Sequence, residues 1–272
     1  MIKNHFEKEI TISGTQSNGA TANNKKDVTK IQSWLNLYAH SNPESGTATA
    51  IDGDFGPATE TAVKNFQKAV KISQTGKVDN AVFAKLCKPM STAFEGAAKG
   101  KNLRELIVNV ANNHLNQHPF ELVIKGQSNS GPWVRSYMDA NEGEPWFWCM
   151  GFVQTIIDQA TSQQGKDFRT LMPLTYSCDT VGTTALNKGL LRRVVEIRTD
   201  PSIVKPGDIF LVQKSPSDWF HTGLVMAIQD DVFETIEGNT NTDGSHNGTG
   251  VYRRLRNFVR SKLDVFSIEP LV

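Results

Sequence analysis

The stretch Pro145–Val153, which reads PWFWCMGFV, joins an aromatic cluster to an apolar pattern that continues through Ile156 and Ile157. This pattern predicts a helix that begins near Cys149. The free backbone N–H groups and the positive dipole end of a helix start favour an anion, so a thiol placed there has a lowered pKa. Because a thiolate is a nucleophile, Cys149 is a candidate for catalysis; the alternative is a small buried side chain.

Two apolar runs downstream supply partners for such a thiol. His221 precedes the run Leu224–Ile228, which predicts a histidine at the start of a buried strand. An imidazole that faces the thiol can take and return its proton, although an ordinary core histidine is the alternative. In the next run, alternation puts Glu237 and Asn239 on the same side of a strand end, where either could orient the imidazole. Turn chemistry accounts for Gly238 but not for the glutamate.

Together these motifs resemble the pattern of the cysteine, histidine-dependent amidohydrolase/peptidase (CHAP) family of papain-like bacterial cell-wall hydrolases. Trp148-Cys149, His221-Thr222-Gly223 and Glu237-Gly238-Asn239 stand in the order of that family, and Asn129–Tyr137 is similar to the lead-in of its bacterial members. The resemblance covers about residues 103–272. It implies Cys149 as nucleophile, His221 as general base and acid, and Glu237 or Asn239 as the group that orients the imidazole.

The N-terminal part carries a second pattern. An amphipathic helix over Asp27–Tyr38 is followed by a Gly/Asp turn at Ile51–Pro57, a second helix over Ala58–Val70 and a shorter one over Val78–Leu86. This pattern resembles, over about residues 26–87, the peptidoglycan-binding module of three short helices that many cell-wall hydrolases carry. Wall binding by this part of the chain is implied by that resemblance.

The sequence does not indicate a metal site. An EF-hand loop needs oxygen ligands at alternating positions and a closing glutamate, and the spacing around Asp52 and Asp54 does not match this pattern. We therefore expect a structural role for these two residues. His114 and His118 could share one helix face, but no glutamate lies between them as in the metalloprotease motif. We therefore expect neither a metal nor another cofactor.

A stretch of small residues over Lys88–Lys101 predicts a flexible linker. The predicted division is an N-terminal extension (1–25), a peptidoglycan-binding-like module (26–88), a linker (89–102) and a CHAP-like catalytic domain (103–272). In the last part helices come first, and strand candidates follow from Leu191–Ile197 onward, which is typical of a segregated α+β domain. The expected fold is α+β: a small all-α module of three helices, then a papain-like domain with an antiparallel sheet.

Composition restricts the class of function. The 272 residues carry a formal net charge of +1, so no large basic field for nucleic acid is present. Cys87, Cys149 and Cys178 are too few and too scattered for a disulfide framework or a paired zinc motif, and we expect reduced thiols. No apolar stretch approaches a membrane span, so we expect no membrane insertion.

The N-terminus lacks the continuous hydrophobic region of a secretory signal. We therefore expect synthesis in the cytoplasm and action at the cell wall or periplasm after release through a phage lysis pore or delivery by an injection apparatus. The expected partner is peptidoglycan. An injected effector would also have an immunity protein, and the sequence does not choose between lysin and effector.

The expected reaction is acyl transfer, in which Cys149 attacks an amide carbonyl of the wall peptide, His221 protonates the leaving amine and water hydrolyses the thioester. The backbone N–H of Cys149 is a natural oxyanion donor. The bond is either that between N-acetylmuramic acid and L-alanine or a peptide bond of the stem or cross-bridge. A catalytically silent wall-binding protein and a transpeptidase are the alternatives. Four indoles are candidates for lining the substrate groove, with core packing as the alternative for each: Trp133, Trp146, Trp148 and Trp219.

Overall fold

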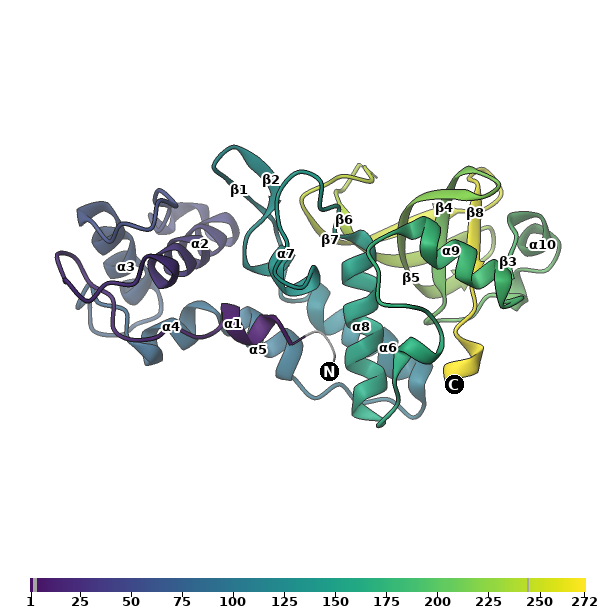
Figure 1. Ribbon diagram of the computed structural model, residues 1–272, viewed down its shortest axis with the longest axis horizontal. Helices are drawn as coiled ribbons and strands as arrows, with labels where there is room; N and C mark the ends of the chain where they lie inside the picture. The colour runs from purple at the N-terminus through teal and green to yellow at the C-terminus, as the bar shows by residue number, and fades with distance from the viewer. Residues whose placement is uncertain (2–3, 244) are drawn as a thin grey trace. The chain divides into compact units, whose positions relative to one another are not determined.

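The chain folds into two compact units in the computed structural model, which describes residues 1, 4–243 and 245–272 (Figure 1). The module unit consists of residues 4–92 and 120–143, and the sheet unit consists of Met1 with residues 93–119 and 144–272. Residues 120–143, which the sequence placed in the catalytic domain, thus belong to the module unit. Each unit is built from segments that are separated in sequence.

The first half of the predicted linker is helical. Helix α5 spans Lys88–Glu95, and Met90, Ala93 and Phe94 are buried. These three side chains recur at helical spacing and give the helix an apolar face. The small residues around them are typical of a flexible linker, and for this reason the sequence predicted a linker here instead of a helix.

Three helices form the predicted helical module: α2 (Lys25–Ser41), α3 (Pro57–Ala69) and α4 (Asn80–Leu86). Asn24 caps α2 by accepting the N–H groups of Lys26 and Asp27. Asp79 caps α4, and Pro57 occupies the first position of α3, where its missing N–H costs no helical hydrogen bond. The buried apolar side chains of this part include Val28, Ile31, Trp34, Leu35, Phe55, Val63, Phe66 and Phe83.

The other elements of the module unit are α1 (Phe6–Glu9), a 3-10 turn (Pro43–Ser45), β1 (Leu122–Ile124), β2 (Gln127–Ser130) and α7 (Pro132–Tyr137). Arg135 of α7 donates to both carboxylate oxygens of Glu9, at 2.8 and 2.6 Å, and to Glu142 at 2.7 Å. The indole of Trp34 packs edge-on against Trp133, with ring centroids 6.1 Å apart. These contacts hold the N-terminal extension and residues 120–143 against the helices of the module.

The sheet unit contains a six-stranded antiparallel sheet of order β3-β8-β4-β5-β6-β7. Its strands are β3 (Leu191–Arg192), β4 (Ile209–Ser215), β5 (Asp218–Gln229), β6 (Val232–Thr240), β7 (Gly250–Asn257) and β8 (Leu263–Phe266). Strands β4 to β7 pair consecutively, and β8 returns beside β4. The predicted α+β class, with an antiparallel sheet after a helical module, is confirmed.

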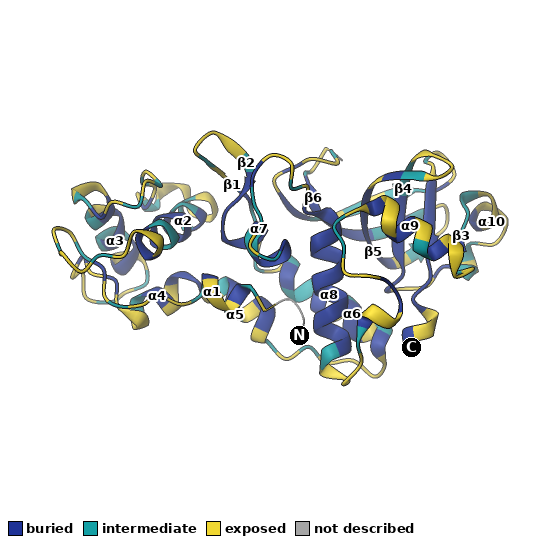
Figure 2. Cartoon of the chain, in the orientation of Figure 1, coloured by how far each residue is buried: buried dark blue, intermediate teal, exposed yellow. Residues whose placement is uncertain are grey.

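Helices accompany this sheet: α6 (Leu103–Leu115), α8 (Cys149–Gln163), α9 (Cys178–Asn187) and α10 (Val194–Thr199), with 3-10 turns at 168–170, 201–203 and 269–271. Helix α8 contacts α6, β5 and β6, and α9 also contacts β5. Every residue of α8 from Cys149 to Thr161 is buried, as the dark blue of this helix in Figure 2 shows. A helix buried on all sides gives its first residue a rigid support.

The predicted strand over Leu191–Ile197 is only two residues long and is followed by α10. Branched side chains at Val194, Val195 and Ile197 favoured a strand. The N–H of Arg193 instead donates to Glu196 at 2.7 Å, and that of Val194 donates to Asp264 at 3.1 Å. These acceptors satisfy the free donors of a helix start and so override the local propensity.

Candidate active site

Cys149 is the first residue of α8, as the sequence predicted, and only 3% of it is exposed. Its sulfur accepts a hydrogen bond from the backbone N–H of Met150 and also interacts with Cys178 and His221. Cys178 is likewise the first residue of its helix, α9. Two helix starts and three hydrogen-bonding groups therefore surround the sulfur, which favours its thiolate form.

His221 lies on β5 and is fully buried. Its Nε2 is 2.9 Å from Oε2 of Glu237. The other ring nitrogen, Nδ1, is buried and has no nitrogen or oxygen partner among the described residues, which leaves it for the interaction with Cys149. The imidazole is therefore placed between the thiol and the carboxylate, as proton exchange with a nucleophile requires.

Glu237, on β6, is the group that orients His221. Arg256 of β7 grips both oxygens of this carboxylate: Nε donates to Oε1 at 2.8 Å, and Nη2 donates to Oε2. The hydroxyl of Thr235 also donates to Oε1 at 2.6 Å. Since Glu237 is fully buried, these bonds compensate its charge and fix its position.

Asn239 has a different role from the one the sequence left open. A bulge between Glu237 and Thr240 gives Asn239 a positive φ of 54°. The side-chain amide of Asn239 forms hydrogen bonds with both of its atoms in one orientation. Its nitrogen then donates to Gly248 O at 2.7 Å, and its oxygen accepts the N–H of Trp148 at 3.3 Å. Trp148 is the N-cap of α8, so Asn239 secures the start of the helix that carries the thiol.

Two motif glycines are required by close packing. A Cβ on Gly223 would lie 2.7 Å from Cγ of Glu237 and 2.7 Å from the ring of Phe210. A Cβ on Gly238 would lie 2.6 Å from Cβ of Phe152. Gly238 lies within β6, so the sequence interpretation of this residue as a turn glycine is wrong. Gly223 thus allows the close approach of β5 to Glu237, and Gly238 allows the close approach of β6 to Phe152 of α8.

The interaction between the thiol of Cys149 and the imidazole of His221 favours the charged form of each group. The hydrogen bond from Cys178 lowers the pKa of Cys149 well below its usual value, assisted by His221 and opposed by burial. Burial lowers the pKa of His221, but its interactions with Cys149 and Glu237 prevail and raise it to about 9. The pKa of Cys178 is raised well above normal by its bond to Cys149 and by burial, so Cys178 stays a neutral donor. These shifts favour a thiolate and an imidazolium as the resting pair, and the two groups titrate together.

The orienting carboxylate keeps its charge. Burial raises the pKa of Glu237, yet the bonds from Arg256 and His221 outweigh it and bring the pKa to about 2. A carboxylate with so low a pKa does not take the proton from His221. It holds the ring and stabilises the imidazolium instead.

Only one of the four candidate groove indoles keeps a substantially accessible ring. Trp148 and Trp219 are buried in the sheet unit, where Nε1 of Trp219 donates to Asp264 at 3.1 Å. Trp133 is buried in the module unit. These three fit the core-packing alternative, because a buried ring has no face for a ligand. Trp146 is half-buried and lies edge-on to Tyr176, with ring centroids 6.1 Å apart.

Several residues near the site were missed by the sequence analysis. Phe147 and Phe220 are 49% and 37% exposed and directly precede Trp148 and His221, a proximity that could have identified them. His246 stacks edge-on against Phe220, with ring centroids 4.6 Å apart, and its ring lies 6.4 Å from that of His221. Burial and the charge of His221 lower the pKa of His246. No local pattern marked His246, Arg256 or Cys178.

No group of three or more His, Cys, Asp or Glu side chains is placed to hold a metal ion in the described part of the chain. His114, one of the two histidines considered as ligands, is buried and bonds Gln159 at 2.9 Å, and burial lowers its pKa to about 4. Asp52 has a structural role, since its Oδ1 accepts hydrogen bonds from Gln32 and from the N–H of Asp54, both at 2.8 Å.

Across the described residues, no helix combines the length and the apolar character needed to cross a bilayer.

Comparison with known proteins identifies the N-terminal part. Residues 24–86 match the family model of a putative peptidoglycan binding domain, which confirms that the chain carries the kind of module expected in its N-terminal part. A zinc D-Ala-D-Ala carboxypeptidase from Streptomyces albus G is 38% identical over 76 residues, which are 28% of this chain and 27% of that protein. The chain thus spans about a quarter of the length of this curated relative. No solved structure matches. The family match lies wholly within the module unit.

Proposed function

We propose that this chain is a cysteine-dependent peptidoglycan hydrolase that cleaves an amide bond of the wall peptide. The observation that carries the proposal is the buried series Cys149, His221 and Glu237, in which an imidazole is held at 2.9 Å from a carboxylate and interacts with a thiol. The peptidoglycan binding domain over residues 24–86 supplies the substrate class.

The thiolate of Cys149 would attack the amide carbonyl carbon and form a tetrahedral intermediate. As the carbon–nitrogen bond breaks, the imidazolium of His221 gives its Nδ1 proton to the leaving amine and becomes neutral. Water then attacks the thioester while His221 takes one of its protons. Loss of the thiolate releases a carboxylic acid and restores the starting pair.

The start of α8 is suited to stabilise the oxyanion of that intermediate. The backbone N–H of Cys149 belongs to the first turn of the helix, where N–H groups have no carbonyl partner within the helix. Asn239 holds the N–H of Trp148, the preceding residue, and so limits movement of this turn. Asn239 therefore supports the nucleophile and the oxyanion donor, whereas Glu237 supports the base.

Delivery and the bond cleaved belong to the same proposal. Action at the cell wall or periplasm, as a phage lysin or as an injected antibacterial effector with an immunity protein, fits a peptidoglycan substrate. Cleavage between N-acetylmuramic acid and L-alanine, or within the stem or cross-bridge, is compatible with the same acyl transfer. The half-buried Trp146 and the exposed Phe147 and Phe220 are the side chains that we expect to contact the substrate.

A second candidate is a wall-binding protein without catalysis. Two observations favour it: the family match covers only the binding module, and Cys149 is just 3% exposed. In this case the sheet unit would have a supporting role, and Cys149 and His221 would not contact a substrate.

The deciding experiment incubates Gram-negative and Gram-positive sacculi with wild type and with Cys149→Ala, followed by mass spectrometry of released fragments. New termini from wild type alone are expected, and their identity distinguishes an amidase from an endopeptidase. The same reaction is run with a thiol alkylating reagent and, separately, with a metal chelator. Loss of activity with the chelator but not with the alkylating reagent would sink the cysteine mechanism. Sedimentation of both proteins with sacculi without new termini would favour the wall binder.

A further inference from the structure

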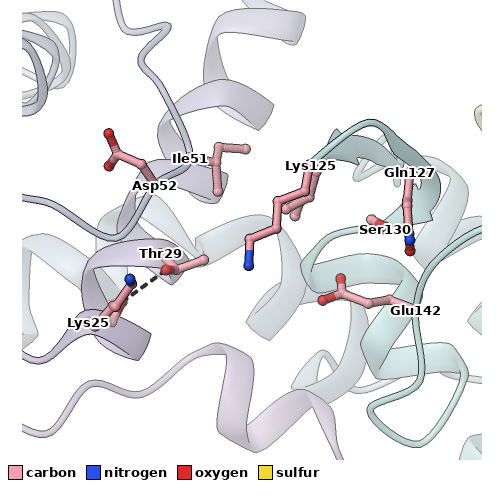
Figure 3. A pocket seen from close by; sticks show the side chains of 9 residues that line it. Lys25, Thr29, Ile51, Asp52, Lys125, Gln127, Ser130 and Glu142 are labelled. Atoms are coloured by element: carbon pink, nitrogen blue, oxygen red, sulfur yellow. Dashed lines mark hydrogen bonds between the residues drawn. The ribbon is translucent and has the colours of Figure 1, made fainter.

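The module unit contains a pocket with a wall that lies outside the residues matched by the family model. It has a volume of about 280 Å³. Lys25, Thr29, Ile51 and Asp52 line it from the matched residues, 24–86. The other side consists of Ile124, Lys125, Gln127, Ser130 and Glu142, all from residues 120–143 (Figure 3). The pocket is therefore a property of this chain as well as of its binding module.

Lys125 is held over this pocket by an unusual backbone. Ile124 pairs with Gln127, so Lys125 and Gly126 form a two-residue hairpin loop with φ values of 52° and 79°. Both angles are positive, as in a type I′ turn, where asparagine or glycine normally occupies the first position. Lysine at that position costs about 1 kcal/mol. Figure 3 shows its ammonium directed into the space between Thr29 and Glu142.

Glu142 presents a carboxylate from a fixed position. Its Oε2 accepts the N–H of Gly131 at 2.8 Å and Nη1 of Arg135 at 2.7 Å. Arg135 is itself anchored by two bonds to Glu9. Oε1 of Glu142 takes part in none of these bonds, and the side chain is 33% exposed. One oxygen thus secures the group while the other remains open to a ligand.

The opposite charges of the pocket interact only at a distance: the charge of Lys25 assists the hydrogen bonds from Asp54 and Gln32 in lowering the pKa of Asp52. Among the described residues, neither Lys125 nor Lys25 forms an ion pair with Glu142 or Asp52. The backbone of Gly53 packs closely against Lys25, since a Cβ on Gly53 would lie 2.6 Å from Cγ of that side chain. A pocket with separated ammonium and carboxylate groups is complementary to a ligand that carries both charges.

We infer that this pocket binds a zwitterionic portion of a wall peptide, with its carboxylate at Lys125 and Lys25 and its free amine at Glu142. A volume of 280 Å³ is below the roughly 300–1,000 Å³ of most small-molecule sites, so it suits one or two amino-acid residues better than a glycan chain. N-acetylated sugars have no ammonium group to pair with Glu142. The inference deepens the proposed function, on which it rests for the choice of peptidoglycan as the source of the peptide.

The test is isothermal titration calorimetry of the full chain carrying Cys149→Ala, so that the ligand is not consumed. The ligands are the tetrapeptide L-Ala-γ-D-Glu-meso-diaminopimelate-D-Ala with free ends, the same peptide acetylated on its amines and amidated on its carboxyls, and chitotetraose. We expect binding of the free tetrapeptide alone. Equal binding of the blocked peptide, binding of chitotetraose alone, or no binding at all would overturn the inference.

Variants of the same protein locate the site. Lys125→Gln should weaken tetrapeptide binding about fivefold and Glu142→Gln about tenfold, because each removes one charge from the pocket. Lys68→Gln, on an exposed position of α3, removes the same charge as the first variant outside the pocket and should leave binding unchanged. Equal affinities in all three variants would place the peptide elsewhere. Sacculus cleavage by wild type tests the proposed function separately, so either claim can fail alone.

Discussion

Each unit of this protein contains a glutamate gripped by an arginine, and the two pairs differ in what they leave open. Glu237 of the sheet unit is fully buried, and its two oxygens are occupied by Arg256, Thr235 and His221. Glu142 of the module unit uses one oxygen for Arg135 and keeps a third of its side chain exposed. A saturated, buried carboxylate is suited to fix an imidazole, whereas a half-satisfied, accessible one is suited to meet a ligand.

The largest effect expected from this difference is on catalysis. Glu237→Gln should lower the rate of sacculus hydrolysis at least about a hundredfold, because the imidazolium loses its counter-charge. Glu142→Gln should weaken binding of the wall peptide but leave kcat on soluble wall fragments unchanged. The measurement is a progress curve of amide cleavage for both variants, with thermal unfolding to establish that each is folded.

Glu237→Gln also leaves Arg256, whose side chain is only 16% exposed, as a cation without its partner. The double variant Glu237→Gln with Arg256→Met removes both charges, and it should recover stability but not activity. Recovery of activity in this double variant would assign the loss to folding and would contradict the orienting role of Glu237.

The next effect separates the packing of the two units. Gly223→Ala should destabilise the protein by about 1–3 kcal/mol, since its methyl group would overlap Glu237 and Phe210. Gly14→Ala in the module unit has no atom within 4 Å of its new methyl group and should change stability little. Urea unfolding of both variants measures the difference. Equal midpoints would mean that the sheet yields without displacing Glu237.

Short motifs predicted the site better than they predicted its surroundings. Cys149, His221 and Glu237 each begin or end an apolar run, so local periodicity identified them. Arg256 reaches Glu237 only through the pairing of β6 with β7, and Cys178 reaches Cys149 because α8 and α9 both contact β5. Such contacts depend on strand register and helix packing, which no local pattern encodes.

The same limit applies to the division into units. The helical module followed from spacing and capping residues, and the family match confirms it. No local pattern indicated that residues 120–143 belong with the module, because contacts such as that of Arg135 with Glu9 join positions 126 apart. The choice between Glu237 and Asn239 likewise depended on a bulge that turns Asn239 towards Trp148.

The pH dependence of cleavage should report the titration of the Cys149 thiolate and the His221 imidazolium. His221 has a pKa raised to about 9, so its imidazolium persists below that pH and is lost above it, and the rate should fall above about pH 9. The pKa of Cys149 is lowered, so the acid limb should lie well below the usual range of a thiol. Profiles of kcat/KM from pH 4 to 10 measure both limbs. A single rise near pH 8 to 9 would contradict a preformed thiolate.

The smallest effect concerns the second thiol of the site. Cys178→Ala removes the hydrogen bond that contributes most to lowering the pKa of Cys149, so the acid limb should move to higher pH. At pH 6 the rate of alkylation of Cys149 by iodoacetamide, followed by peptide mass spectrometry, should fall several-fold. Cys87→Ala is the matched control, because Cys87 is also buried but lies in the module unit. If both variants alkylate like wild type, His221 and the start of α8 suffice to maintain the thiolate, and Cys178 serves packing alone.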